Sequence, residues 1–220
     1  MAAIIIRHGE VTANVNGLFS GGGSDTPLTQ RGIETTKLLA QEIKSRFPSV
    51  ADEKVYYYTS HRKRTIDTAA IIHENFSNKH IFYPNKSLLL AERHGGIYEN
   101  QPIDLFHKKM EELESQGKDT FFWSEDGCES SYEHRLRVMN WIDRKGVIHY
   151  GLKKSDILLI IVCHRYTSQH LRELVFGGKE EPHDHGTAYV YQINDGRLHK
   201  EIIDVSQKRI YSANNSPVVP

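Results

Sequence analysis

The stretch from Ala3 to Glu10 constrains the fold more than any other part of the chain. It opens with an alanine and three isoleucines, an apolar run that predicts a buried β-strand. Arg7, His8 and Gly9 follow at once, and glycine permits a sharp turn and a close ligand approach. Because open α/β sheets bind ligands beyond the carboxyl ends of their strands, the stretch predicts an anion site there. His8 is the candidate nucleophile and Arg7 the candidate clamp.

A second stretch repeats this arrangement near the other end of the chain. Residues 157–163 are the most apolar run and predict a strand buried on both faces. His164 follows that run directly, as His8 follows Arg7 after the first run. If the two strands lie side by side in parallel, both imidazoles reach the same sheet edge. The alternative for His164 is a buried histidine with a structural role.

Three further stretches carry candidate chemistry. Gly21–Gly23 form a flexible loop that suits a phosphate cradle or a plain linker, and no Gly-Lys-Ser/Thr follows for a nucleotide loop. His61–Arg64 are predicted in the first turn of a helix, where the dipole disfavours cations. That cluster therefore suits an anion, or is a solvated basic turn. Glu92 follows a candidate strand and is a candidate proton donor, with a surface ion pair as the alternative.

Composition limits the class of protein. The length of 220 residues is typical of one domain, and 28 basic residues balance 28 acidic ones. This balance gives no reason to expect nucleic acid or a membrane surface as a partner. The sequence shows no long apolar segment and no signal peptide, so we expect a cytoplasmic protein.

Two other site chemistries fit the sequence less well. A cysteine-dependent phosphatase needs an arginine six positions after its cysteine, but Gln169 stands there after Cys163. Cys163 and Cys128 do not form a disulfide framework either. The run His183–His185 leaves a metal site open, although no further ligands stand at suitable spacing.

Five blocks of residues, in this order, resemble the signature of the histidine phosphatase superfamily, which includes the cofactor-dependent phosphoglycerate mutases. The blocks are Arg7–Glu10 with Asn14, Phe19–Gly21, Asp25–Thr29 and Gly32; Tyr58–Ser60 with Arg64, Thr68 and Ala69; Glu92–Glu99; Glu129 and Ser130 with Arg137 and Val138; and Cys163 with His164. Together they cover about residues 3 to 200, and the combination is specific. Two positions depart from the pattern, because Arg165 and Asn100 stand where the family usually has glycine.

The resemblance implies a three-layer α/β/α sandwich with a mostly parallel central sheet and one antiparallel strand. We expect a single domain over residues 1–205, a short cap at 97–128 and a C-terminal tail at 206–220. Periodicity and caps predict the other elements. The helices are expected at 30–47, 61–73, 102–116, 129–148 and 167–176, and the strands at 55–58, 86–90, 187–193 and 198–205, with a hairpin turn at 194–196.

The resemblance also implies roles for single residues. His8 would attack phosphorus, while Glu92 would protonate the leaving alkoxide and then deprotonate water. Arg7, Arg64 and His164 would surround the phosphoryl oxygens. Substrate contacts are expected from Asn14, Ser20, Gly21, Arg62 and Arg165. We expect no metal and no cofactor.

These features favour hydrolysis of a small phosphomonoester. The mutases continue past the Glu-Arg-His motif with Tyr-Gly, whereas this chain has Gly95 and Gly96. Their long lid carries a lysine and paired arginines, but residues 101–128 contain no arginine and Ile103 stands at the lysine position. A shorter lid admits water, which ends the cycle as hydrolysis. Mutase activity is the alternative, followed by a non-catalytic phosphate-binding module. A small-molecule substrate is the only partner expected, and the oligomeric state is left open.

Overall fold

The computed structural model describes residues 2–48, 50, 54–76, 82–145, 157–177, 180–194 and 197–207. In these residues the strands form one six-stranded sheet, in the order β3-β2-β4-β1-β5-β6. Only β5 runs against the others, because it pairs antiparallel with both β1 and β6. The strands are β1 (Ala2–Arg7), β2 (Val55–Ser60), β3 (Asn85–Ser87), β4 (Leu158–Cys163), β5 (Thr187–Asn194) and β6 (Arg197–Asp204). The expected mostly parallel sheet with one antiparallel strand is therefore confirmed.

The two apolar runs of the sequence form the centre of the sheet. Every residue of β1 and β4 is buried, and the strands pair in parallel with Arg7 opposite Cys163. This register brings His8 and His164 to the same sheet edge, and the backbone N–H of His8 donates to the Cys163 carbonyl at 3.0 Å. The prediction that neighbouring parallel strands bring both imidazoles to the same sheet edge is therefore confirmed.

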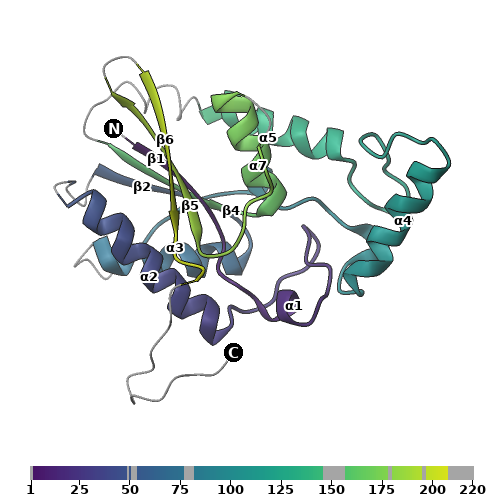
Figure 1. Cartoon of the computed structure of the whole chain (residues 1–220), viewed down its shortest axis with the longest axis horizontal. Coiled ribbons are helices and arrows are strands. Elements are labelled where there is room, and N and C mark those ends of the chain that lie inside the picture. Colours follow the sequence, from purple (N-terminus) through teal and green to yellow (C-terminus); the bar gives the residue numbers. More distant parts are fainter. Residues whose placement is uncertain are drawn as a thin grey trace.

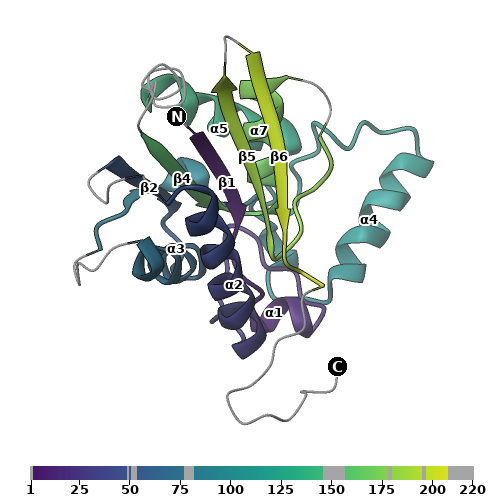
Figure 2. The ribbon, with the colours of Figure 1, turned by 60° about the vertical axis from the view of Figure 1, so that its left-hand side comes forward.

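Helices cover both faces of the sheet (Figure 1). The apolar side chains of α2 and α3 pack on the face that includes Ile4 and Ile160, and those of α5 and α7 on the face that includes Ile5 and Ile161. Helix α4 lies to one side of these layers (Figure 2) and builds a small aromatic core of its own. The helices are α1 (Thr12–Val15), α2 (Gln30–Arg46), α3 (Lys63–Phe76), α4 (Ile103–Ser115), α5 (Ser131–Lys145) and α7 (Arg165–Phe176). The described part of the chain contains no helix with the length and apolar character of a membrane span.

Several element boundaries differ from the sequence expectation. The strand expected at 86–90 ends at Ser87, because the Ser87 hydroxyl accepts from the Leu89 amide and starts a 3-10 helix at Leu88–Leu90. Helix α3 begins only at Lys63, so His61 and Arg62 precede it. Helix α7 begins at Arg165, two residues earlier than expected.

The helix expected at 129–148 also starts later than its first residue. The Ser130 hydroxyl accepts from the amide of Glu133, whose carboxylate accepts from the Ser130 amide, and this reciprocal cap starts α5 at Ser131. The expected end of this helix at 146–148, the hairpin turn at 195–196 and the tail from 208 onward lie outside the described residues.

Candidate active site

His8 lies at the centre of the site with one ring nitrogen already committed. Its Nδ1 donates to the Gly9 carbonyl at 2.8 Å, so its Nε2 keeps a free lone pair. Burial lowers the pKa of His8 well below its usual value, and the positive charges of Arg64 and Arg7 lower it further. The ring is therefore neutral over the physiological pH range, as a nucleophile must be. The His164 ring lies edge-on to it, with centroids 5.2 Å apart.

Two buried arginines are fixed beside these rings by backbone carbonyls. Arg7 donates from Nη1 to the His183 carbonyl at 3.1 Å. Arg64 donates to the carbonyls of Ser24 at 2.6 Å and Gly21 at 2.9 Å, and pairs with Asp25 at 3.3 Å. The loop at 20–25 is thereby tied to the start of α3, which the sequence analysis did not foresee for Asp25.

Several nitrogens in this cluster have no hydrogen-bond partner. The Nε atoms of Arg7 and Arg64 and both ring nitrogens of His164 are buried and unpaired. A buried donor without a partner costs about 1–3 kcal/mol. An anion with several oxygens, such as a phosphoryl group, would satisfy these donors together.

Glu92 is buried, with 8% of its surface exposed, and it lines the same pocket as Arg7. Burial raises its pKa, although the backbone amides of Arg93 and Tyr166 donate to its two oxygens at 2.9 and 3.1 Å. The Thr167 hydroxyl donates to the Ala91 carbonyl at 2.8 Å and so holds the same segment. A carboxyl group that retains its proton to higher pH than usual is suited to act as a general acid.

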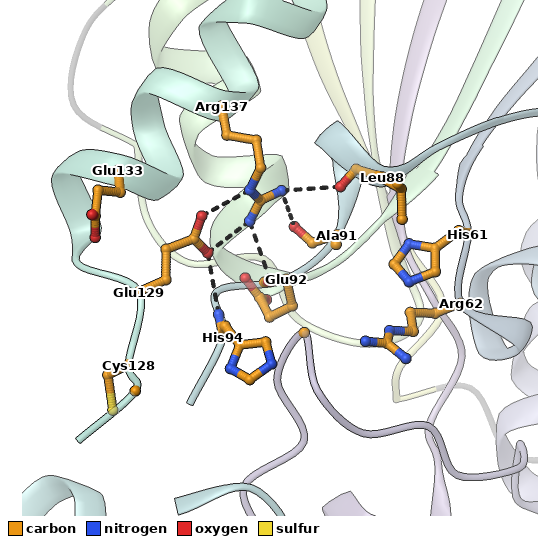
Figure 3. Close-up of a pocket in the computed structure, with 12 residues that line it drawn as sticks. His61, Arg62, Leu88, Ala91, Glu92, His94, Cys128, Glu129, Glu133 and Arg137 are labelled. Carbon is orange, nitrogen blue, oxygen red and sulfur yellow. Dashed lines mark hydrogen bonds and ion pairs between the residues drawn. The ribbon is translucent and has the colours of Figure 1, made fainter. Parts of the chain in front are cut away.

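Arg137 of α5 fixes the backbone that carries Glu92 (Figure 3). Its Nη1 donates to the carbonyls of Leu89 at 2.9 Å and Ala91 at 3.0 Å, and its Nη2 donates to the Glu92 carbonyl at 3.3 Å. The Glu129 carboxylate accepts from Nε and Nη2 at 2.8 Å each, which balances the charge of the guanidinium. Arg137 belongs to a motif block that the sequence analysis noted without a role, and here it acts as a positioning residue.

Replacing Arg137 with methionine is expected to lower kcat by about 100-fold, because a displaced proton donor loses alignment. KM should change little, since Arg137 does not line the pocket that contains Arg7. The measurement is steady-state kinetics on an alkyl phosphate, with thermal melting to confirm folding. Arg144→Met, at the exposed end of the same helix, is the matched control. A folded Arg137→Met protein with the parent kcat would contradict this role.

A pocket of about 910 Å³ reaches the cluster at Arg7, whereas His8, Arg64 and His164 are not part of its lining. Of the expected site residues, those that line it are Arg7, Asn14, Ser20, Gly21, Glu92 and Arg165. The side-chain oxygen of Asn14 accepts from the Val11 amide, and the Gly21 amide donates to Glu99, so neither group is open to a ligand. Arg62 lines a different cavity of about 540 Å³, together with His61, Glu92 and Arg137 (Figure 3).

The segment 183–185, which the sequence leaves open as a metal site, contributes to the pocket through His185. His185 lies 5.5 Å from His8, measured between ring centroids, and lines the pocket. Burial, with Arg7 and Arg165 nearby, lowers its pKa to about 2, so it is a neutral neighbour. Both ring nitrogens of His183 are engaged, with Ser168 at 2.7 Å and Thr187 at 3.0 Å, which leaves none for a metal. Within the described ranges no three His, Cys, Asp or Glu side chains gather as metal ligands.

One departure from the family pattern keeps the backbone shape of glycine. Asn100 has a φ of 63°, in the left-handed region that glycine favours and asparagine tolerates better than most residues. Arg165, the other departure, is the first residue of α7 and pairs weakly with Asp184 at 3.9 Å.

The sequence matches one protein family over most of its length and one curated relative over part of it. Residues 3–196 match the family model of the histidine phosphatase superfamily, branch 1. A 2,3-bisphosphoglycerate-dependent phosphoglycerate mutase of Thermoplasma acidophilum is 39% identical over 75 residues, which is 34% of each chain, so the match spans about a third of that relative.

Solved structures resemble the whole domain. A putative alpha-ribazole-5'-P phosphatase from Escherichia coli is 22% identical with a TM-score of 0.68, over 93% of this chain and 96% of that one. A phosphoglycerate mutase from Bacillus anthracis is 19% identical with a TM-score of 0.70, over 92% of both chains. At these identities the likeness establishes the fold.

Proposed function

The chain belongs to branch 1 of the histidine phosphatase superfamily, and on that premise we propose that it is a phosphomonoester hydrolase acting through a phosphohistidine on His8. Relatives and neighbours named as phosphatases and mutases support either activity. The observation that carries the proposal is the free Nε2 of His8 beside unpaired donors of Arg7, Arg64 and His164.

The proposed reaction has two steps. In the first, Nε2 of His8 bonds to phosphorus, the ester P–O bond breaks, and Glu92 gives its proton to the departing alkoxide. In the second, Glu92 takes a proton from water as that water attacks the phosphohistidine, which releases inorganic phosphate and frees His8. Arg7, Arg64 and His164 stabilise the negative charge on the equatorial oxygens in both steps. We propose that these groups supply the charge without a metal ion.

The substrate is proposed to be a small phosphorylated metabolite in the cytoplasm. Ser20 and Arg165 are proposed to contact it from the pocket lining, together with Asn14 through its side-chain nitrogen and Gly21 through van der Waals contact. Arg62 is proposed to contact it from the neighbouring cavity, which Glu92 also lines. Residues 97–128 are proposed to act as a cap, which is supported by the presence of Phe106, Met110 and Phe121 in the lining.

Packing at Gly95 favours hydrolysis over mutase chemistry. A side chain at this position would collide with the ring of Phe19, which occupies the space beside it. The tyrosine that mutases carry at this position would therefore fit here only if the Phe19 ring moved. Without that tyrosine and without arginines in residues 101–128, the chain lacks the groups that hold a phosphoglycerate in the mutase cycle.

The test compares two reactions of the purified protein in parallel, both with a metal chelator present. One assay measures inorganic phosphate release from a panel of phosphomonoesters without primer. The other measures conversion of 3- to 2-phosphoglycerate with 2,3-bisphosphoglycerate as primer. We expect phosphate release to dominate. Mutase turnover above the hydrolysis of every ester would overturn the choice of hydrolase, and chelator inhibition reversed by one divalent metal would overturn metal independence.

A further inference from the structure

The main pocket is larger than a phosphoryl group and a short carbon chain require. Its volume of about 910 Å³ lies near the upper end of the range of about 300–1,000 Å³ for sites of drug-sized ligands. The lining runs from Arg7 and Glu92 at the sheet edge to Met110 of α4 and Phe121 beyond it. The room beyond the reaction centre is therefore available to the leaving group.

Aromatic and apolar side chains provide one wall of this space. Phe19 and Phe106 lie 4.9 Å apart between ring centroids, and Met110 packs against the same cluster. Phe121 lines the pocket with 37% of its surface exposed, and Phe122 supports it edge-on at 5.1 Å. An exposed aromatic face held by its neighbours is a platform on which another ring can stack.

The rest of the lining is polar, and its arginines already have partners within the chain. Arg135 pairs with Glu173 at 2.5 Å, and Glu173 also accepts from Gln169 at 3.0 Å. Arg93 donates to the Glu129 carbonyl at 2.6 Å and to Ser131 at 3.1 Å, and lies 5.3 Å from the centre of the Phe106 ring.

The charged groups of the lining away from the reaction centre are equal in number. The lining contains no lysine, and Arg93, Arg135 and Arg165 are matched by three carboxylates, those of Asp119, Glu173 and Asp184. A second anionic group on the substrate would therefore meet no excess of positive charge away from the reaction centre. The Nη2 of Arg93 is buried without a hydrogen-bond partner and can donate to a neutral oxygen or nitrogen.

We propose that the natural leaving group is an uncharged alcohol that carries an aromatic or heteroaromatic ring, seated against Phe121 and Met110. This inference rests on the proposed phosphatase function and names its substrate class. A ring placed there removes apolar surface from water on both partners, whereas a carboxylate there would lose hydration in a lining whose arginines and carboxylates are equal in number.

Three primary alkyl phosphates with similar leaving groups test the proposal: propyl phosphate, 3-phenylpropyl phosphate and 4-phosphooxybutanoate. We expect kcat/KM for the phenyl ester to exceed that for the propyl ester by about tenfold or more. The carboxylate ester should be no better than the propyl ester. Equal rates for the phenyl and propyl esters, or a preference for the carboxylate, would overturn this inference. Hydrolysis of none of the three would instead count against the phosphatase function itself.

Variants locate the preference within the pocket. Phe121→Ala and Met110→Ala are each expected to reduce the phenyl-to-propyl ratio of kcat/KM toward one. Leu105→Ala, an exposed leucine on α4 outside the lining, is the matched control and should keep the parent ratio. A parent ratio in both folded pocket variants would show that the ring binds elsewhere and contradict the assignment.

Discussion

Replacing His8 with alanine is expected to reduce phosphate release by at least about 1,000-fold, because it removes the atom that bonds to phosphorus. The remaining groups, Arg7, Arg64 and His164, would still bind the phosphoryl group, so inorganic phosphate or vanadate should still bind the variant. The loss should therefore appear in kcat, and the comparison of kcat with ligand affinity separates a missing nucleophile from a damaged site.

His199→Ala is the matched control, since His199 lies on an exposed face of β6 far along the chain from the site. It should retain the parent activity. Thermal melting of both variants checks that they are folded. A folded His8→Ala protein with more than about a thousandth of the parent kcat would show that His8 is not the nucleophile.

Replacing Glu92 with glutamine is expected to have an effect that depends on the leaving group. An alkyl alkoxide needs a proton as it departs, so kcat/KM for an alkyl phosphate should fall by about 100- to 10,000-fold. A nitrophenolate departs without a proton, so kcat/KM for p-nitrophenyl phosphate should fall far less. Glu111→Gln, an exposed carboxylate on α4, serves as the control. Equal losses on both esters would mean that Glu92 only maintains structure.

The pH profile provides the second readout for Glu92. Burial raises its pKa, so the acid form persists to higher pH than an ordinary glutamic acid and is lost as the pH rises through that value. The rate of alkyl ester hydrolysis by the parent chain should fall over the same pH range, which forms the alkaline limb of its pH profile. The Glu92→Gln profile should lack this limb, while the ionisation of the substrate remains common to both proteins. An unchanged limb in the variant would assign it to another group.

The central part of the fold could be predicted because it depends on simple patterns. Two apolar runs, each ending near a histidine, predict neighbouring parallel strands. The two strands do pair in parallel, with Arg7 opposite Cys163. A strand at 187–193 was likewise expected from its alternating pattern, and one antiparallel strand was expected from the family resemblance. Leu88–Leu90 could not be predicted in this way, because a short apolar run suits a strand and a buried helical turn equally well.

Site residues could be predicted only where a neighbouring strand or helix in the sequence determines their position. Arg7 ends β1, His8 and His164 follow β1 and β4, and Arg64 lies in the first turn of α3, as the sequence patterns predict. Glu92 follows a 3-10 helix instead of the expected strand.

Long-range contacts were beyond the sequence patterns. Nothing near Arg62 in the sequence shows that it lines a different cavity from Arg7, and nothing near Arg137 shows that it reaches back to the carbonyls before Glu92. Such contacts join residues that are tens of positions apart, and no local periodicity records them.

The most direct test of the phosphohistidine uses rapid quenching of Glu92→Gln with p-nitrophenyl phosphate. This ester can phosphorylate His8 without an acid, but the missing base slows the attack of water, so the intermediate should accumulate. We expect a burst of about one equivalent of nitrophenol, with acid-labile, alkali-stable phosphate located on His8 by mass spectrometry. Steady turnover without a burst and without phosphate on His8, or phosphate on another residue, would contradict the account.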